Sequence, residues 1–401
     1  MGIKLKNYLI VTSSYWGFTL TDGALRMLVL LHFFKLGFSP FTLAFLFLLY
    51  EAAGIFANLF GGWLATYFGI TKMLFAGIAV QIIGLVALSL LNNSWSMEFS
   101  ILWVFLSQGI SGIAKDFTKT ASKSAIKVTT NESQHHLYKL VAWFTGSKNS
   151  MKGIGFFLGG LLLETFGFKH GLWLMAFCLF LILIISIYFL PKNLGKSMPS
   201  KSIKELFSKS KNINILSLAR IFLFGARDIW FVVGLPVFLY SNKWEFWQVG
   251  SFLAIWTIVY GGMQSMAPKI SGTSHDGKSR ELLSAKFFII FLTLIPIIIL
   301  IYNFASKPKD IELVIIIILG LSVFSIPFAI NSSLHSYLVL AYSKNKIAED
   351  VGFYYAANAS GRLLGTLLSG ILYQFGGINF CLIGCSVFLI ICSLLTFSLS
   401  K

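Results

Sequence analysis

Long apolar runs separated by short polar breaks recur along the whole chain. Many of these runs are about 20 residues long, the length that an α-helix needs to cross the hydrocarbon core of a bilayer. Hydropathy and the charge breaks between the runs predict an all-α membrane protein with transmembrane helices. The twelve predicted spans cover residues 8–33, 41–64, 73–91, 99–121, 140–165, 171–190, 213–240, 247–267, 286–302, 312–336, 347–374 and 378–398.

Composition agrees with this pattern. The 401 residues are 56% hydrophobic and 12% charged, and the mean hydropathy is +0.80. A net charge of +17 would suggest a nucleic-acid partner in a soluble chain. Here most lysines fall in short loops between spans, so we expect contact with membrane lipid and no nucleic-acid partner.

The distribution of Lys and Arg predicts the orientation. If both termini are cytoplasmic, the inner loops and tails hold nineteen of these residues and the outer loops hold five. Cytoplasmic loops of membrane proteins carry such an excess. The sequence therefore predicts a multi-pass protein with both termini in the cytoplasm.

A Lys-rich segment divides the chain into two sets of six spans. We predict an N-terminal half (1–190), a cytoplasmic linker (191–212) and a C-terminal half (213–401). Aligning Asp22 with Asp228 matches the first two spans to the seventh and eighth. "KGIGFFLGGLLLETFGF" (152–168) matches "RLLGTLLSGILYQFGGI" (362–378), so that Lys152 aligns with Arg362. Two parallel six-helix halves are the plan of the major facilitator superfamily fold.

Residues 73–91, 171–190, 287–302 and 378–398, which make up spans three, six, nine and twelve, contain no ionisable side chain except Tyr and Cys. Charged side chains are costly in lipid and are expected to face a cavity. In the major facilitator fold these four spans lie outside the cavity, so the charge distribution fits that fold.

Eight cations lie within the other spans or at their edges, and five acids could balance them. The cations are Arg26, Lys115, Lys119, Lys148, Lys152, Arg220, Arg227 and Arg362; the acids are Asp22, Glu51, Asp116, Asp228 and Glu164, the last nearer the outer rim. The surplus of three positive charges is unfavourable in a low-dielectric site unless something neutralises it.

Several of these residues have structural explanations. Asp22 and Arg26 are four residues apart and could form an ion pair on one helical face. Lys119 could extend to the interface, Arg220 lies near the start of its helix and is interpreted as structural, and Lys123 and Lys127 continue the lysine ribbon as a positive-inside anchor.

Lys148 and Lys152 share one face of span five, with no nearby acid in sequence. We expect Lys152 and Arg362 to face each other across the cavity and bind an anion.

The predicted substrate is a small, multiply charged oxyanion. The predicted substrate-binding residues are Arg26, Lys115, Lys119, Lys148, Lys152, Arg227 and Arg362; the proton-coupling candidates are Asp22, Glu51, Asp116 and Asp228, with His335 also able to titrate.

No enzymatic motif accompanies these charges. The sequence has no H-E-x-x-H, G-x-S-x-G or P-loop, so we predict no catalytic residues, no metal site and no cofactor. Cys381 and Cys385 could form a soft-metal pair on one helix face, or serve as small apolar filler.

Two groups of motifs carry a family resemblance. Between spans two and three, "GGWLATYFGITK" (61–72) resembles the major facilitator signature, with Thr66 where an Asp is usual. "YWGFTLTDGALRMLVLLHFF" (15–34), "LFLLYEAAGIFANLFGGWL" (46–64), "GISGIAKDFTKTASKSAIK" (109–127) and "GSKNSMKGIGFFLGG" (146–160) resemble the organoarsenical efflux permease (ArsJ) family.

This resemblance implies export, across a bacterial cytoplasmic membrane, of an arsenate ester of 3-phosphoglycerate. Glyceraldehyde-3-phosphate dehydrogenase would supply the ester, and its export would give arsenate resistance. The alternatives are an organophosphate or phosphate exchanger, or another organic-anion transporter, of the same fold. A drug exporter is disfavoured by the cationic surplus, and a receptor or scaffold would not depend on Lys152 or Arg362.

Overall fold

The computed structural model describes residues 3–92, 94–129, 134–191, 209–272, 274, 276, 278–343 and 347–400. Within these ranges the regular structure is entirely helical. The helices are α1 (Ile3–Lys35), α2 (Pro40–Leu46), α3 (Leu48–Phe68), α4 (Ile70–Ser89), α5 (Met97–Thr129), α6 (Gln134–Thr165), α7 (Gly167–Phe189), α8 (Lys211–Phe231), α9 (Gly234–Ser241), α10 (Phe246–Ser271), α11 (Ser279–Ser306), α12 (Asp310–Tyr342) and α13 (Ile347–Phe397).

These helices correspond to the twelve predicted spans. In the described residues, nine segments are long and apolar enough to cross a membrane, and the last of them, Asp350–Phe397, is long enough to cross twice. The more polar α6 and α10 correspond to spans five and eight. Most of the predicted linker (191–212) lies outside the described residues.

Two predicted spans are interrupted instead of continuous. Span two is divided into α2 and α3, and span seven into α8 and α9. Pro236 lies in the first turn of α9, where its missing N–H needs no helical partner but its ring would clash with a continuing helix. The freed backbone N–H groups of Val233 and Gly234 donate to the Ser369 hydroxyl oxygen at 3.2 and 3.0 Å. The interruption is therefore satisfied internally.

Spans eleven and twelve form the continuous segment α13, with a kink at Gly376 and Gly377. Gly377 has a φ of 61°, a conformation that glycine adopts at little cost. Gly69 has a φ of 86° in the short connection before α4. The chain turns sharply at both sites, and each turn lies within a few residues of a predicted span boundary.

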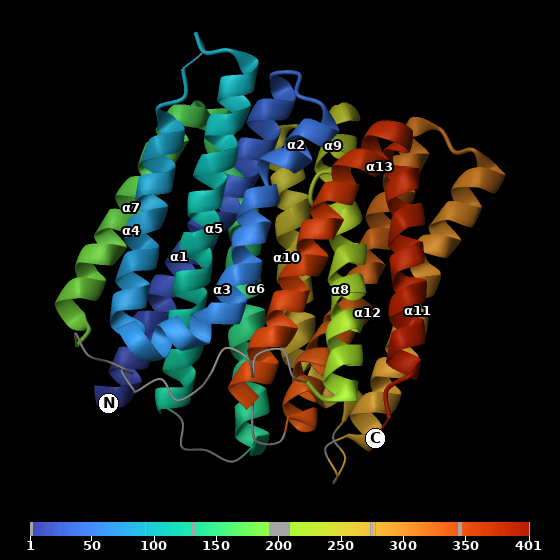
Figure 1. Ribbon diagram of the computed structural model, residues 1–401. Coiled ribbons are helices and arrows are strands. Elements are labelled where there is room, and N and C mark those ends of the chain that lie inside the picture. The colour runs from blue at the N-terminus through green and yellow to red at the C-terminus, as the bar shows by residue number, and fades with distance from the viewer. Residues whose placement is uncertain are drawn as a thin grey trace.

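The N-terminal helices, blue to green in Figure 1, and the C-terminal helices, yellow to red, lie beside one another with the ends of the chain at the same end of the bundle. Large apolar side chains such as Phe177, Phe291 and Leu394 are exposed on α7, α11 and α13. These surfaces suit the hydrocarbon interior of a membrane.

Glycines let helices of the two halves approach closely along two lines of contact. In the first, between α6 and α10, a Cβ on Gly146 would lie 2.4 Å from the Gly261 carbonyl oxygen, and one on Gly160 would lie 2.5 Å from that of Phe246. In the second, between α13 and α2, a Cβ on Gly370 would lie 2.6 Å from the Pro40 carbonyl oxygen. Small residues at such crossings are typical of membrane helix packing.

We predict that adding one methyl group at Gly261 destabilises the protein, whereas the same change at Gly262 does not. A Cβ at Gly261 would meet the Gly146 carbonyl oxygen at 2.5 Å, while a Cβ at Gly262 would have nothing within 4 Å. Overpacking of this kind costs about 1–3 kcal/mol. Thermal unfolding in detergent should show a lower midpoint for Gly261→Ala only, and equal midpoints would contradict the close contact between α6 and α10.

Candidate functional site

A cavity of about 150 Å³ lies between the two halves. Its described lining comes from α1, α3, α5 and α6 of the N-terminal half and from α8, α10, α12 and α13 of the C-terminal half. Within the described chain, α4, α7, α11 and the part of α13 after Gly377 contribute no lining residue. These are spans three, six, nine and twelve, as their lack of charged side chains predicted.

The seven predicted substrate-binding residues and the four proton-coupling candidates all line this cavity, and so does Arg220. Eight cations therefore face four carboxylates, a formal excess of four positive charges. The predicted excess was three because it included Glu164. The structure places Glu164 on an exposed part of α6, where its carboxylate accepts from the Trp247 backbone N–H at 3.3 Å.

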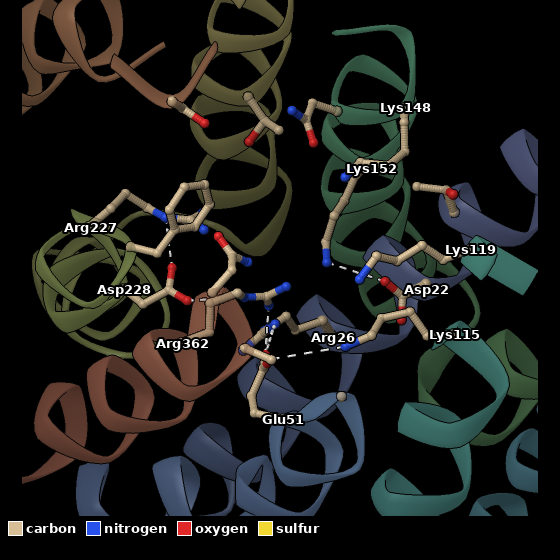
Figure 2. A pocket seen from close by; sticks show the side chains of 18 of the residues that line it. Asp22, Arg26, Glu51, Lys115, Lys119, Lys148, Lys152, Arg227, Asp228 and Arg362 are labelled. Carbon is tan, nitrogen blue, oxygen red and sulfur yellow. Dashed lines mark hydrogen bonds and ion pairs between the residues drawn. The ribbon is translucent and has the colours of Figure 1, made fainter. Parts of the chain in front are cut away.

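Glu51 is shared by three of the cations. Its Oε1 lies 3.0 Å from Arg26 Nη1 and 2.6 Å from Arg362 Nη2, and its Oε2 lies 3.9 Å from Lys115 Nζ. Glu51 itself is 1% exposed. Arg362 belongs to the C-terminal half, so this carboxylate joins the two halves by an ion pair (Figure 2).

The internal repeat is reproduced by two equivalent ion pairs. Lys152 Nζ lies 3.2 Å from Asp22 Oδ2, and Arg362 Nε lies 3.2 Å from Asp228 Oδ2. Asp22 aligns with Asp228 and Lys152 with Arg362 in the repeat. The pair that the sequence allowed between Asp22 and Arg26 is not formed, because each residue has a partner on another helix.

Asp116 balances the lysines of α5. Its Oδ1 lies 3.2 Å from Lys119 Nζ, and its Oδ2 lies 3.8 Å from Lys115 Nζ. Lys119 also donates to Asn58 Oδ1 at 2.8 Å. Lys119 therefore points into the cavity and does not extend to the membrane interface. The side chains of Lys123 and Lys127, the predicted anchors, lie outside the described residues.

Lys148 differs from the other cavity cations. It lies one turn before Lys152 on α6 and lines the cavity, yet in the described part of the chain no carboxylate is within ion-pair distance of its ammonium group. Arg26 also retains an unused donor, because its buried Nη2 has no hydrogen-bond partner. These donors are available to a bound anion.

Arg220 is held by uncharged acceptors, in agreement with its structural interpretation. Its Nε donates to Asn358 Oδ1 at 2.8 Å and its Nη1 to the Ser332 carbonyl oxygen at 2.9 Å. Its guanidinium carbon also lies 4.0 Å from the centre of the Phe224 ring. Arg220 nevertheless adds a positive charge to the cavity wall.

Neutral residues that were not predicted from the sequence also position these charges. The Tyr50 hydroxyl donates to Asp22 Oδ1, and the Tyr50 ring lies 3.9 Å from Lys115 Nζ. Asn58 lies on the same face of α3 as Glu51, seven residues further on. This seven-residue spacing could have identified Asn58 from the sequence. The cation–π contacts of Tyr50 could not be predicted in this way, because they depend on which helices are neighbours.

Sequence comparison assigns the family. The profile of the Major Facilitator Superfamily matches residues 8–348. The chain belongs to the major facilitator superfamily. As a member of this superfamily, the protein is a multi-pass membrane transporter. No curated protein matches the chain at a significant level of sequence similarity.

A solved structure of this superfamily fold resembles the whole chain. The crystal structure of a bacterial homologue of the iron transporter ferroportin, in an outward-facing state, superposes with a TM-score of 0.69 at 11% identity. The alignment covers 99% of each chain. At this identity the similarity establishes the fold of this major facilitator protein and not its substrate.

The cysteines lie apart from the charged cavity. Cys381, Cys385 and Cys392 are buried in the hydrophobic core of the C-terminal half, and Cys178 is exposed on α7. Among the described residues there is no group of three or more His, Cys, Asp or Glu side chains that could hold a metal ion.

We predict that Glu51→Gln destabilises the protein strongly, because Arg26, Lys115 and Arg362 lose the charge that they share. Removing one partner of a buried ion pair costs about 3–5 kcal/mol. The midpoint of thermal unfolding in detergent measures the change.

The matched control is Glu312→Gln on α12, where an exposed carboxylate accepts from the Tyr302 hydroxyl at 2.8 Å. Surface substitutions of this kind change stability by no more than about 0.5 kcal/mol. Equal effects of the two substitutions would mean that Glu51 does not neutralise the cavity.

Proposed function

We propose that this major facilitator protein transports small, multiply charged oxyanions, and that its cargo is the arsenate ester of 3-phosphoglycerate. The observation that carries the proposal is the formal excess of four positive charges on the wall of a cavity between the halves. A guest that carries several negative charges would neutralise this excess.

The electrostatics favour an anion over other cargo. Positive charges in a low-dielectric environment repel one another and are stabilised by anions within hydrogen-bond reach. Ammonium and guanidinium groups bind tetrahedral oxyanions through charge-assisted hydrogen bonds. Lys148 and the free Nη2 of Arg26 supply donors that the protein does not use itself. A metal cation, by analogy with the iron transporter to which the structural neighbour is related, would be repelled by the same charges.

The specific cargo and direction rest on the resemblance to organoarsenical efflux permeases. In this proposal, glyceraldehyde-3-phosphate dehydrogenase forms the ester in the cytoplasm, and the transporter exports it across the bacterial cytoplasmic membrane. Both termini are cytoplasmic in this arrangement, in line with the excess of Lys and Arg in the inner loops. An organophosphate or phosphate exchanger is the alternative, because phosphate and arsenate esters present similar oxyanions to the same residues.

Proton coupling would use one of the four cavity carboxylates, Asp22, Glu51, Asp116 and Asp228. None of the four stands out, and the cations from both halves that contact Glu51 favour its charged form. Protonation of Glu51 would weaken the ion pair with Arg362 and so loosen the connection between the halves. His335, although buried, does not line the cavity. This coupling is measured by uptake of the arsenated ester into everted vesicles with and without a proton gradient.

We predict that Lys148→Gln reduces transport by roughly tenfold or more without unfolding the protein, since one charge-assisted contact is worth about 1.5–3 kcal/mol. Lys148 has no ion pair to break among the described residues, whereas a substitution of Lys152 or Arg362 would break ion pairs with buried carboxylates. Uptake of the arsenated ester into everted vesicles measures the effect.

Two control variants accompany Lys148→Gln. Lys148→Arg keeps the charge and should keep most of the activity. Lys169→Gln removes an exposed charge at the start of α7 and should transport normally. Full activity of Lys148→Gln would remove this lysine from the site.

We predict that arsenate-sensitive cells gain tolerance to arsenate when this protein is expressed together with glyceraldehyde-3-phosphate dehydrogenase. They should gain little tolerance to arsenite, which does not form the ester. Growth inhibition over a series of arsenate and arsenite concentrations measures this. Tolerance that appears without the dehydrogenase, or only toward arsenite, would contradict the proposed cargo and leave the oxyanion exchanger as the better assignment.

A further inference from the structure

A second hollow, a groove between α11 and the part of α13 after Gly377, lies on the outer surface of the C-terminal half. Leu300 and Ser386 are the buried residues of its lining. Its exposed lining residues are the apolar Ile301, Phe304, Ala305, Ile383 and Val387. Among the described residues no charged side chain lines this groove, and none of its lining is shared with the central cavity.

The packing of α11 against α13 explains why a groove forms here. The Thr293 and Ser393 hydroxyl oxygens are 3.0 Å apart, and Asn303 Nδ2 donates to Asn379 Oδ1 at 3.0 Å. These two ties are about 15 Å apart along α11, and the lining residues of α13 all fall between them. The lining on α11 begins directly after Pro296, which lies inside the helix. A proline inside a helix removes a backbone hydrogen bond and kinks the helix, which accounts for a gap between helices that are tied on both sides of it.

Polar residues at the end of α11 locate the groove in one leaflet of the membrane. The exposed Tyr302 donates its hydroxyl to Glu312 at 2.8 Å, and tyrosines are enriched where a helix meets the membrane–water interface. Helix α11 ends at Ser306 and is followed by the exposed Lys307 and Lys309. The connection from α11 to α12, orange in Figure 1, lies at the end of the bundle opposite the chain termini. The groove therefore runs from this interface into the hydrocarbon.

The interface end of the groove carries both signs of charge. Lys307 and Lys309 are positive, Asp310 and Glu312 are negative, and all four are exposed. Inside a bilayer, apolar contact alone selects no particular lipid, because the surrounding acyl chains are equally apolar. Any preference must come from the headgroup. A headgroup with a phosphate and a primary ammonium could make charge-assisted hydrogen bonds with both kinds of side chain.

We propose that this groove is a binding site for one phospholipid with an ethanolamine headgroup. One acyl chain lies in the groove between α11 and α13, the phosphate contacts Lys307 and Lys309, and the ammonium contacts Asp310 or Glu312. A choline headgroup has no N–H to donate to these carboxylates, and a glycerol headgroup has no positive charge to offer them. The site is independent of the cargo proposed for the central cavity.

Native mass spectrometry of the purified full-length protein tests the headgroup preference. Phosphatidylethanolamine, phosphatidylcholine and phosphatidylglycerol with identical acyl chains are offered in equal amounts in detergent. We expect one phosphatidylethanolamine to be retained about fivefold more than either of the others, the ratio that one exposed charge contact supplies. Equal retention of the three lipids would overturn the proposal, because the groove would then hold only unselected lipid.

Four variants locate the two parts of the site. Val387→Trp fills the groove and should abolish retention of the lipid, whereas Val323→Trp, on an exposed part of α12, should have no effect. Asp310→Asn should remove the preference for ethanolamine over choline. Lys307→Gln should lower retention of all three lipids about threefold or more, because each has a phosphate. Thermal unfolding of each variant verifies that the fold is intact.

The remaining outcomes also decide the proposal. Unchanged retention in Lys307→Gln and Asp310→Asn, which alter exposed side chains only, would overturn it even if Val387→Trp failed to fold. A dimer that Val387→Trp dissociates would mean that a second copy of the chain covers this face instead of a lipid. Loss of the lipid in Val387→Trp, together with loss of the preference in Asp310→Asn, would support the site. Failure to transport the arsenated ester would leave this result unaffected.

Discussion

Three of the four carboxylates that line the described cavity are each shared between cations, and this sharing is what lets so much positive charge remain between packed helices. Eight cations and four carboxylates could not be accommodated as separate pairs. Glu51 instead contacts three cations, and Asp116 and Asp228 contact two each. Ion pairs buried in this way contribute little net stability, but the loss of one carboxylate leaves several charges uncompensated. After this sharing, the cavity wall still has a formal excess of four positive charges.

The same charges explain the arrangement of the helices around the cavity. A helix with Lys or Arg in its central turns must keep that charged face away from lipid, so the charged faces of α1, α5, α6, α8 and α13 line the cavity. Helices α4, α7 and α11, whose central turns carry no charged side chain, present residues such as Phe177 and Leu283 outward. Close approach of the inner helices requires glycine at their crossings, as at Gly155, where a Cβ would lie 2.2 Å from the Leu20 carbonyl oxygen.

Much of this could be predicted from the sequence because membrane insertion imposes rules on single helices. Span length, charge bias and the cost of buried charge depend on local sequence, and they identified the spans and the cavity-lining residues. Pairing between helices does not depend on local sequence in this way. The sequence offered Asp22, four residues away, as a possible partner of Arg26, but Arg26 pairs with Glu51 on α3. Tyr50 and the interruption at Pro236 were missed because their partners, Asp22 and Ser369, lie far away in sequence. The boundaries 1–190, 191–212 and 213–401 stay predictions.

The two lines of glycine contact between the halves, α6 with α10 and α13 with α2, also restrict how the halves can move. Backbones touch there, so the helices can roll against each other without separating bulky side chains. Both lines run beside the cavity, because α6, α10 and α13 also contribute lining residues such as Lys152, Thr257 and Arg362. Rolling of the halves about these contacts would leave a guest in the cavity nearly in place while access to it changes from one side of the membrane to the other.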